Sequence, residues 1–310
     1  MKKKPLIIIS GPTATGKSAL GVRLAKDING EIVSADSMQV YRYMNIGTAK
    51  VTVEEMDGVP HHMIDVCDPR TDYSIADYKE AAKKCVDDIL NRGKIPIVVG
   101  GTGFYIHALV YDTDFGITES DGSVREHLEN DLEMYGAGEL FERLRQVDPD
   151  SAEILHMNDT KRVIRALEFY ELYGYRISEH NRREAQNESP YDFIYLALNR
   201  NRNELYGLID QRVDDMMNRG LESEIRYLLS TGCSSTNVSM QGIGYKELIN
   251  CEDIGKAVEE IKLNSRHYAK RQFTWLRHEK NVTWIDSPVS EDDYKWILTE
   301  CSRIITETSE

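Results

Sequence analysis

The sequence has little that would anchor it in a membrane or build a metal centre. Its 310 residues include only 5 cysteines, and none of them forms a C-x-x-C pair. Scattered thiols in odd number are typical of reduced cytoplasmic proteins and argue against a zinc site. No apolar run approaches the roughly 20 residues of a membrane helix. The first residues lead directly into a predicted strand, without room for a signal peptide. We therefore expect a cytoplasmic protein with no membrane segment, and we expect a monomer.

Positive charge is also scarce, because 52 acidic residues outnumber 38 lysines and arginines and leave a net charge of -14. A nucleic-acid-binding protein usually carries a basic surface. The acids gather in stretches such as 129–133, while the bases concentrate elsewhere. The overall charge therefore does not exclude RNA as a partner.

The clearest positive signal is a phosphate-binding loop. Leu6–Ile9 is a short apolar run typical of a strand buried in a parallel sheet. Gly11, Gly16, Lys17 and Ser18 then match the pattern G-x-x-x-x-G-K-[ST]. In such a loop the backbone N–H groups and the following helix bind an anion, the lysine neutralises phosphate oxygens, and the serine hydroxyl ligates Mg²⁺. The motif predicts binding of a diphosphate or triphosphate.

Strands and helices alternate from the start of the chain. The spacing predicts further strands over Glu31–Ala35, Ile95–Val99 and Phe193–Leu198, and a helix to about Asn91 that begins with a Ser74/Asp77 capping box. This alternation predicts the α/β fold class, with a P-loop NTPase-like parallel sheet flanked by helices.

The alternation stops in the middle of the chain. Three helices are predicted without a strand between them, and a polar loop over 178–187 follows; the helices are Val124–Tyr135, Gly138–Gln146 and Thr160–Tyr173. We expect a helical insertion domain over 115–190, carried by a catalytic core of residues 1–114 and 191–310. After Asn203 the core is predicted to be mainly helical.

Polar residues follow two of the predicted strands, where ligands bind in open parallel sheets. Asp36 could ligate Mg²⁺ through water, act as a general base, or cap the next helix, and its position alone leaves these alternatives open. Thr102 stands where many nucleotidases carry a carboxylate, which disfavours ATP hydrolysis as the main task. For the adjacent His61 and His62, packing and hydrogen bonding are favoured over metal binding.

Two basic segments are candidates for anion binding. Thr160 is predicted to cap a helix whose first turns carry Lys161, Arg162 and Arg165, an arrangement suited to RNA phosphates or to a kinase lid. A second predicted helix carries bases at helical spacing, with aromatic residues between them; the bases are Lys262, Arg266, Lys270 and Arg277, flanked by Arg271. This stripe could bind an RNA backbone, or it could be an ordinary solvated helix face.

The motif string resembles one enzyme family over nearly the whole chain. In order, GPTATGKS, ADSMQVYR, VPHHMIDVCDP, VVGGTGFY, KRVIRALE, DQRVDDMMNRGLESE, QGIGYKE and YAKRQFTWLR are similar to bacterial tRNA dimethylallyltransferases, also called tRNA isopentenyltransferases. The resemblance implies transfer of the dimethylallyl group from dimethylallyl diphosphate to N6 of the adenosine just 3′ of the anticodon. The implied substrates are tRNAs that read codons beginning with U, and diphosphate leaves intact.

The resemblance also implies roles for particular residues. Asp36 would be the base for the N6 proton, and Thr102 would hydrogen-bond near the acceptor amine or the diphosphate. The diphosphate would be held with Mg²⁺ by the phosphate loop, with Ser18 as metal ligand; the binding residues are Gly11, Pro12, Thr13, Ala14, Thr15, Gly16, Lys17, Ser18 and Arg212. The tRNA would be contacted by Ser37, Met38, Gln39, Arg125, Lys161, Arg162, Val163, Ile164, Arg165, Gln241, Gly242, Ile243, Gly244, Tyr245, Lys246 and Arg271.

Two other functions remain alternatives at this stage. An ATP-dependent small-molecule kinase would use the same loop, with Arg162 and Arg165 as a lid, and would not need RNA. A nucleotide-gated RNA-binding protein without chemistry of its own would bind RNA even when Asp36 is replaced.

Overall fold

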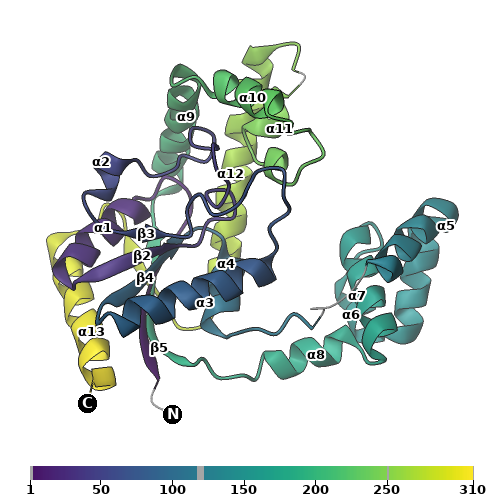
Figure 1. The fold of residues 1–310 in the computed structure, drawn as a ribbon, viewed down its shortest axis with the longest axis horizontal. Coiled ribbons are helices and arrows are strands. Elements are labelled where there is room, and N and C mark those ends of the chain that lie inside the picture. Colours follow the sequence, from purple (N-terminus) through teal and green to yellow (C-terminus); the bar gives the residue numbers. More distant parts are fainter. Residues whose placement is uncertain (1–2, 117–121, 250, 310) are drawn as a thin grey trace. The chain divides into compact units, whose positions relative to one another are not determined.

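The structure is a computed structural model that describes residues 3–116, 122–249 and 251–309. It divides into two compact units, one of residues 1–112 and 190–310 and the other of residues 113–189. The expected domain boundaries lie within two residues of these. Figure 1 shows the strands in the first unit and only helices in the second.

The first unit is built on a parallel sheet in the order β3-β2-β4-β1-β5-β6. Its strands are β1 Lys4–Ser10, β2 Gly30–Ser34, β3 His61–His62, β4 Ile95–Gly100, β5 Tyr191–Asn199 and β6 Val282–Asp286. In register, Ser10 at the end of β1 pairs with Gly100 of β4 and Ala197 of β5. The loops that leave these central strands therefore start side by side.

Helices cover both faces of the sheet (Figure 1). They are α1 Lys17–Asp27, α2 Val53–Met56, α3 Ile75–Asn91, α4 Gly103–Val110, α9 Arg202–Asn218, α10 Leu221–Ser230, the 3₁₀ helix η1 Ser239–Gln241, α11 Tyr245–Leu248, α12 Ile254–His278 and α13 Glu291–Ser309. One core lies under α3 and α4, and a second lies under α1 and α13. A third core joins α9 to α12 with the segment after β2. This segment is thereby held beside the helical layer.

The main strands and the α3 capping box are as the sequence predicts, and both hydrogen bonds of the Ser74/Asp77 box are formed. Two strands were not predicted. β3 is only two residues long, and β6 is a short edge strand in which Ile285 alone is buried. The local sequence indicates these two strands only weakly, because they form by pairing with β2 and β5, which are distant in the chain.

The second unit contains α5 Ser123–Val147, α6 Pro149–Ile154, α7 Thr160–Tyr173 and α8 Ile177–Glu184 around a small core. α5 is interrupted at Gly136, where the gap between two predicted helices lies. The prediction of a loop over 178–187 is wrong, because α8 occupies most of this range. Ser178 at the start of α8 donates from its N–H and hydroxyl to the buried Asp148 carboxylate, at 3.0 and 2.6 Å. This tertiary anchor is invisible in the local sequence.

The predicted cap of α7 also needs correction. Thr160 is the first helical residue, and Asp159 occupies the cap position. Within the described part of the chain, no helix is long and apolar enough to cross a membrane.

Candidate functional site

A cavity of about 370 Å³ opens in the first unit where β1, β2 and β4 end. One end is formed by the phosphate loop with Thr13, Lys17, Ser18 and Arg212. The opposite walls come from the segment after β2, from α9 and α12, and from the region of η1 and α11. The fold thus brings an anion-binding loop to one end of a partly open cavity.

The phosphate loop is held in shape by its own side chains and by the chain after β6. Gly16 has φ 89°, a left-handed conformation that favours glycine at this turn into α1. The Thr15 hydroxyl donates to the Pro12 carbonyl at 2.8 Å, and the Ser287 hydroxyl donates to the Thr15 carbonyl at 2.7 Å. These hydrogen bonds within the protein hold the loop in shape.

Two cations lie at the phosphate end of the cavity. Burial lowers the pKa of Lys17 to about 7, with Arg212 contributing further and Asp36 opposing. Its ammonium donates to the Pro12 carbonyl at 2.7 Å. Burial also lowers the pKa of Arg212, against the attraction of Asp36, and its guanidinium donates to the Thr13 hydroxyl at 3.2 Å. Cations held at such a cost are poised for an anion that would stabilise both of them.

Asp36 and Thr102 lie at the same edge of the sheet, as their positions after β2 and β4 predict. Oδ1 of Asp36 accepts from the N–H groups of Met38 and Gln39, at 2.9 and 3.2 Å. The carboxylate therefore caps a turn rather than a helix, and it also lines the cavity. In the described structure Oδ2 has no hydrogen bond, which leaves it available to a substrate proton.

Thr102 contacts the neighbouring wall of the cavity. Its hydroxyl oxygen accepts from the N–H of Ser37 at 3.0 Å and donates to the Ser37 hydroxyl at 3.3 Å. The side chain therefore holds the Asp36–Gln39 turn against β4. We interpret Thr102 as orienting this turn, in addition to any contact with a ligand.

Two further side chains of α12 line the cavity: Gln272, which was not predicted, and Tyr268, which was expected only as one of the aromatic residues of the basic stripe. The Gln272 amide accepts from the N–H of Thr13 at 3.0 Å and donates to the Gly101 carbonyl at 2.8 Å, so it ties the phosphate loop to the loop after β4. Tyr268 lies beside Thr102, and burial next to Asp36 raises its pKa to about 12. The local sequence gives no signal for the role of Gln272, because both of its bonded partners lie far away in the chain.

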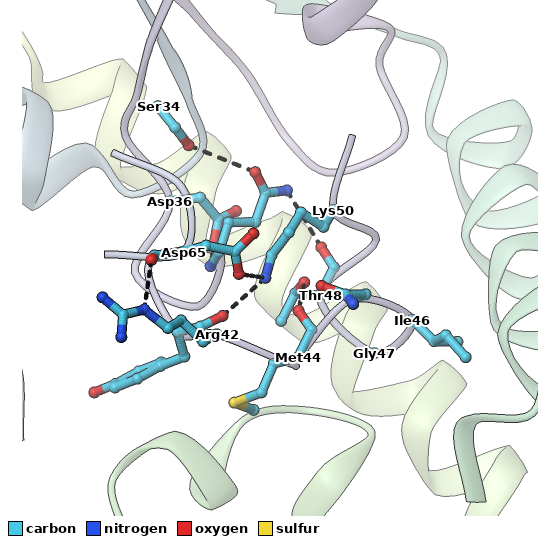
Figure 2. A network of polar contacts seen from close by, with 12 residues as sticks. Ser34, Asp36, Arg42, Met44, Ile46, Gly47, Thr48, Lys50 and Asp65 are labelled. Carbon is cyan, nitrogen blue, oxygen red and sulfur yellow. Dashed lines mark hydrogen bonds and ion pairs between the residues drawn. The ribbon is translucent and has the colours of Figure 1, made fainter. Parts of the chain in front are cut away.

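The wall that follows Gln39 is a tightly bonded loop (Figure 2). The Gln39 amide donates to the carbonyls of Thr48 and Ala49, at 3.3 and 3.4 Å. The buried Lys50 ammonium donates to the Tyr41 carbonyl at 2.8 Å and pairs with Asp65 at 2.6 Å. Because Gln39 makes these bonds, its side chain fixes the wall and is less available to a ligand than expected.

Glu224 of α10 fastens the outer part of this wall. Its carboxylate accepts the successive N–H groups of Asn45, Ile46 and Gly47, at 2.8, 2.7 and 3.1 Å. It also accepts from the Tyr245 hydroxyl at 2.7 Å. One carboxylate therefore joins three separate elements around the cavity, a role that no local pattern could reveal.

The expected tRNA-binding segment 241–246 also borders the cavity. Gln241, Gly242, Ile243, Tyr245 and Lys246 line it, together with Ser37, Met38, Gln39 and Arg271. Tyr245 is fully buried, and its hydroxyl is used by Glu224, so it supports the wall. The lining also includes four apolar side chains, Ile209, Val213, Met216 and Ile261.

The remaining expected tRNA-binding residues belong to the second unit. Val163 and Ile164 are 1% and 4% exposed, so their side chains pack in its core, and contact between this segment and RNA stays a prediction. Arg125 lies 3.4 Å from the buried Glu168 carboxylate, and Arg165 donates to the Phe115 carbonyl at 2.6 Å. Arg162 pairs with Asp159, while Lys161 is exposed.

The basic stripe of α12 separates into two parts. Lys262 and Arg266 pair with Asp214 and Asp210 of α9, at 2.8 and 2.5 Å. Over the residues that the structure describes, no ion pair involves Lys270, Arg271 or Arg277. The N-terminal half of the stripe is thus neutralised by packing, and only its C-terminal half offers free positive charge.

His61 and His62 have the structural role that the sequence favoured. They form β3, and His61 hydrogen-bonds to the Val59 carbonyl at 2.9 Å. His62 contacts the buried Glu31 carboxylate at 2.7 Å. Arg92 and Lys94 also bind Glu31, so this cluster closes the sheet edge away from the cavity.

Comparison with known proteins identifies close relatives. A family described as IPP transferase matches residues 39–279. The tRNA dimethylallyltransferase of Lachnoclostridium phytofermentans is 46% identical over 308 residues, which cover 98% of each chain. That of Caldanaerobacter subterraneus is 47% identical over 296 residues, covering 94% of this chain and 93% of the relative.

Solved structures agree with these relatives. The full-length tRNA isopentenylpyrophosphate transferase of Bacillus halodurans aligns with a TM-score of 0.74 at 41% identity, covering 99% of this chain and 98% of that one. A eukaryotic dimethylallyltransferase acting on tRNA aligns with a TM-score of 0.81 at 30% identity, covering 96% of this chain and 77% of that one.

Proposed function

The chain belongs to the IPP transferase family, and from that premise we propose that it transfers the dimethylallyl group from dimethylallyl diphosphate to tRNA. The acceptor is N6 of the adenosine 3′ to the anticodon, in tRNAs that read codons beginning with U. Almost the full length of this chain aligns with proteins named for this activity, which supports the proposal.

The diphosphate occupies the phosphate end of the cavity. The backbone N–H groups of residues 14–18 surround it, and Lys17 and Arg212 neutralise it from two sides. Both cations already lie at the cavity wall, where burial makes them costly in the absence of an anion. The apolar lining from Ile209, Val213 and Ile261 receives the dimethylallyl group, which has no polar atoms to satisfy.

Mg²⁺ is the metal that suits this site. Over the described residues, no cluster of three or more His, Cys, Asp or Glu side chains could hold a metal ion. Mg²⁺ usually takes one or two protein oxygens and completes its shell with phosphate oxygens and water, so the Ser18 hydroxyl suffices as a protein ligand. When bound, the ion would stabilise negative charge on the departing diphosphate.

The reaction is a substitution at the allylic carbon. The lone pair of adenine N6 forms the new bond to C1 of the dimethylallyl group, and the bond between C1 and the diphosphate oxygen breaks with its electrons. Lys17, Arg212 and the loop N–H groups stabilise the charge that develops on this oxygen. Asp36 takes the N6 proton through Oδ2, while its Oδ1 stays bound to the turn.

The adenine must leave its stack to enter the cavity. Ser37, Met38 and the segment 241–246 border the cavity and are the proposed contacts of the displaced base. The proposed contacts of the RNA backbone are basic side chains. They are Arg271 at the cavity, and Arg125, Lys161, Arg162 and Arg165 on the insertion domain.

The observation that carries this proposal is the combination of a phosphate loop, two partly buried cations, a carboxylate and apolar side chains around one cavity. The test incubates the protein with unmodified tRNA and Mg²⁺ and with either dimethylallyl diphosphate or ATP. Mass analysis of the digested RNA should show an adenosine that gained a dimethylallyl group only with the first donor. ATP turnover without RNA would instead support a small-molecule kinase, and binding without any product would support an RNA-binding protein.

A further inference from the structure

Two exposed aromatic rings of the first unit each come three residues after a cavity-lining residue, Gly101 in one case and Gln272 in the other. Phe104 of α4 is 49% exposed and Trp275 of α12 is 37% exposed. Their ring centroids are 5.9 Å apart at an interplanar angle of 67°, an edge-to-face pair. They come from segments far apart in the sequence, and the packing of α4 against α12 brings them together.

The backbone of the segment 102–104 connects these two rings to Thr102, at the edge of the sheet where Asp36 also lies. Phe104 follows Thr102 by two residues, and Trp275 packs so closely on the intervening Gly103 that a Cβ there would lie 2.2 Å from the indole. On α12, Trp275 lies on the same face as Gln272 and Tyr268, which line the cavity. The two exposed rings are therefore tied, through Gly103 and α12, to elements that line the cavity.

Positive charge accompanies these rings. Arg271 lies one turn before Trp275 on α12, lines the cavity and stacks over the Tyr268 ring at 5.5 Å. It belongs to the half of the α12 stripe that is free of ion pairs in the described chain. Exposed aromatic rings beside an unpaired arginine are the features with which proteins bind unstacked nucleotides, through stacking and phosphate contact.

We propose that Phe104 and Trp275 form a stacking shelf for the nucleotide next to the displaced adenosine. This inference rests on the proposed function, because it assumes that an RNA base enters the cavity. Once the adenine leaves the stack, its neighbour loses a stacking partner on that side. The shelf replaces this partner, and so stabilises the RNA in the opened conformation that the reaction needs.

The test compares Phe104→Ala with the wild type on a synthetic anticodon stem-loop RNA. We expect KM for the RNA to rise about tenfold, with kcat and the Kd of dimethylallyl diphosphate unchanged, because stacking acts on RNA alone. Phe104→Tyr should restore KM. The matched control is Trp296→Ala, which removes a ring that is 41% exposed on α13, a helix with no residue among those that line the cavity, and it should change nothing.

A second set of RNAs identifies the stacked base. Two stem-loops each lack the base on one side of the target adenosine. On one of them, Phe104→Ala and the wild type should have the same KM within about twofold, since the base that stacks is absent. An equal penalty on all three RNAs, or no penalty on any, would overturn the shelf.

The outcome for the wild type separates this inference from the proposed function. If the wild type makes no modified adenosine from the intact stem-loop, the proposed function fails. The same comparison of RNAs by equilibrium binding then decides whether the shelf exists. If the wild type is active and the base-deficient RNAs show no coupling to Phe104, only the shelf fails.

Discussion

Raising the pH should weaken donor binding through Lys17. In the free protein its pKa is lowered from 10.5 to about 7, mainly by burial. A bound diphosphate places negative charge beside the ammonium and should restore the ordinary pKa. Because the protonated form binds, each binding event above pH 7 takes up a proton, and affinity falls as the pH rises.

The size of the effect follows from the two pKa values. At pH 7 about half of the free protein carries a protonated Lys17, and at pH 9 about one molecule in a hundred does. The binding constant for dimethylallyl diphosphate should therefore fall about 50-fold over this range, or by about 2.3 kcal/mol. Lys17 keeps some contact with water, which reduces the expected loss to between about 10- and 50-fold.

Calorimetric titration at pH 8 in two buffers of different ionisation enthalpy measures this proton directly. We expect uptake of about 0.9 proton per donor bound. The donor's own terminal phosphate is already ionised at this pH and adds little. Lys17→Arg serves as the control, because a guanidinium stays charged and should abolish the uptake. Binding by the wild type without proton uptake at pH 8 would refute the account of Lys17.

Three further predictions test the rest of the site. Asp36→Asn should lower kcat by about 100-fold or more with little change in the Kd of the donor, and normal turnover would remove Asp36 as the base. Glu224→Gln should lower the free energy of unfolding in urea by about 1–3 kcal/mol, since one amide oxygen cannot accept what two carboxylate oxygens did; an unchanged midpoint would contradict this. Arg271→Ala should reduce the salt dependence of tRNA binding by about one unit of slope, whereas Arg266→Ala, whose partner is Asp210, should reduce it less. Equal slopes for the two variants would argue against the divided stripe.

The amino-acid sequence by itself determined the features that depend on neighbouring residues. The phosphate loop, the main strands, the capping box of α3 and the break near Gly136 follow from local backbone preferences and from spacing. The sequence also predicted that Asp36 and Thr102 lie at one edge of the sheet, because the carboxyl ends of parallel strands lie at the same edge. The motif string added the family, which the relatives confirm.

The tertiary structure decided which side chains are free to act. Glu224 and Gln272 bind backbone groups that lie 177 and 259 residues away in the chain, so no local pattern contains them. The side chains of Val163 and Ile164 are buried in the core of the second unit. On α12, ion pairs with α9 neutralise the N-terminal half of the basic stripe. Helix spacing gives the direction of a side chain, but only packing determines whether water, an opposite charge or a ligand meets it there.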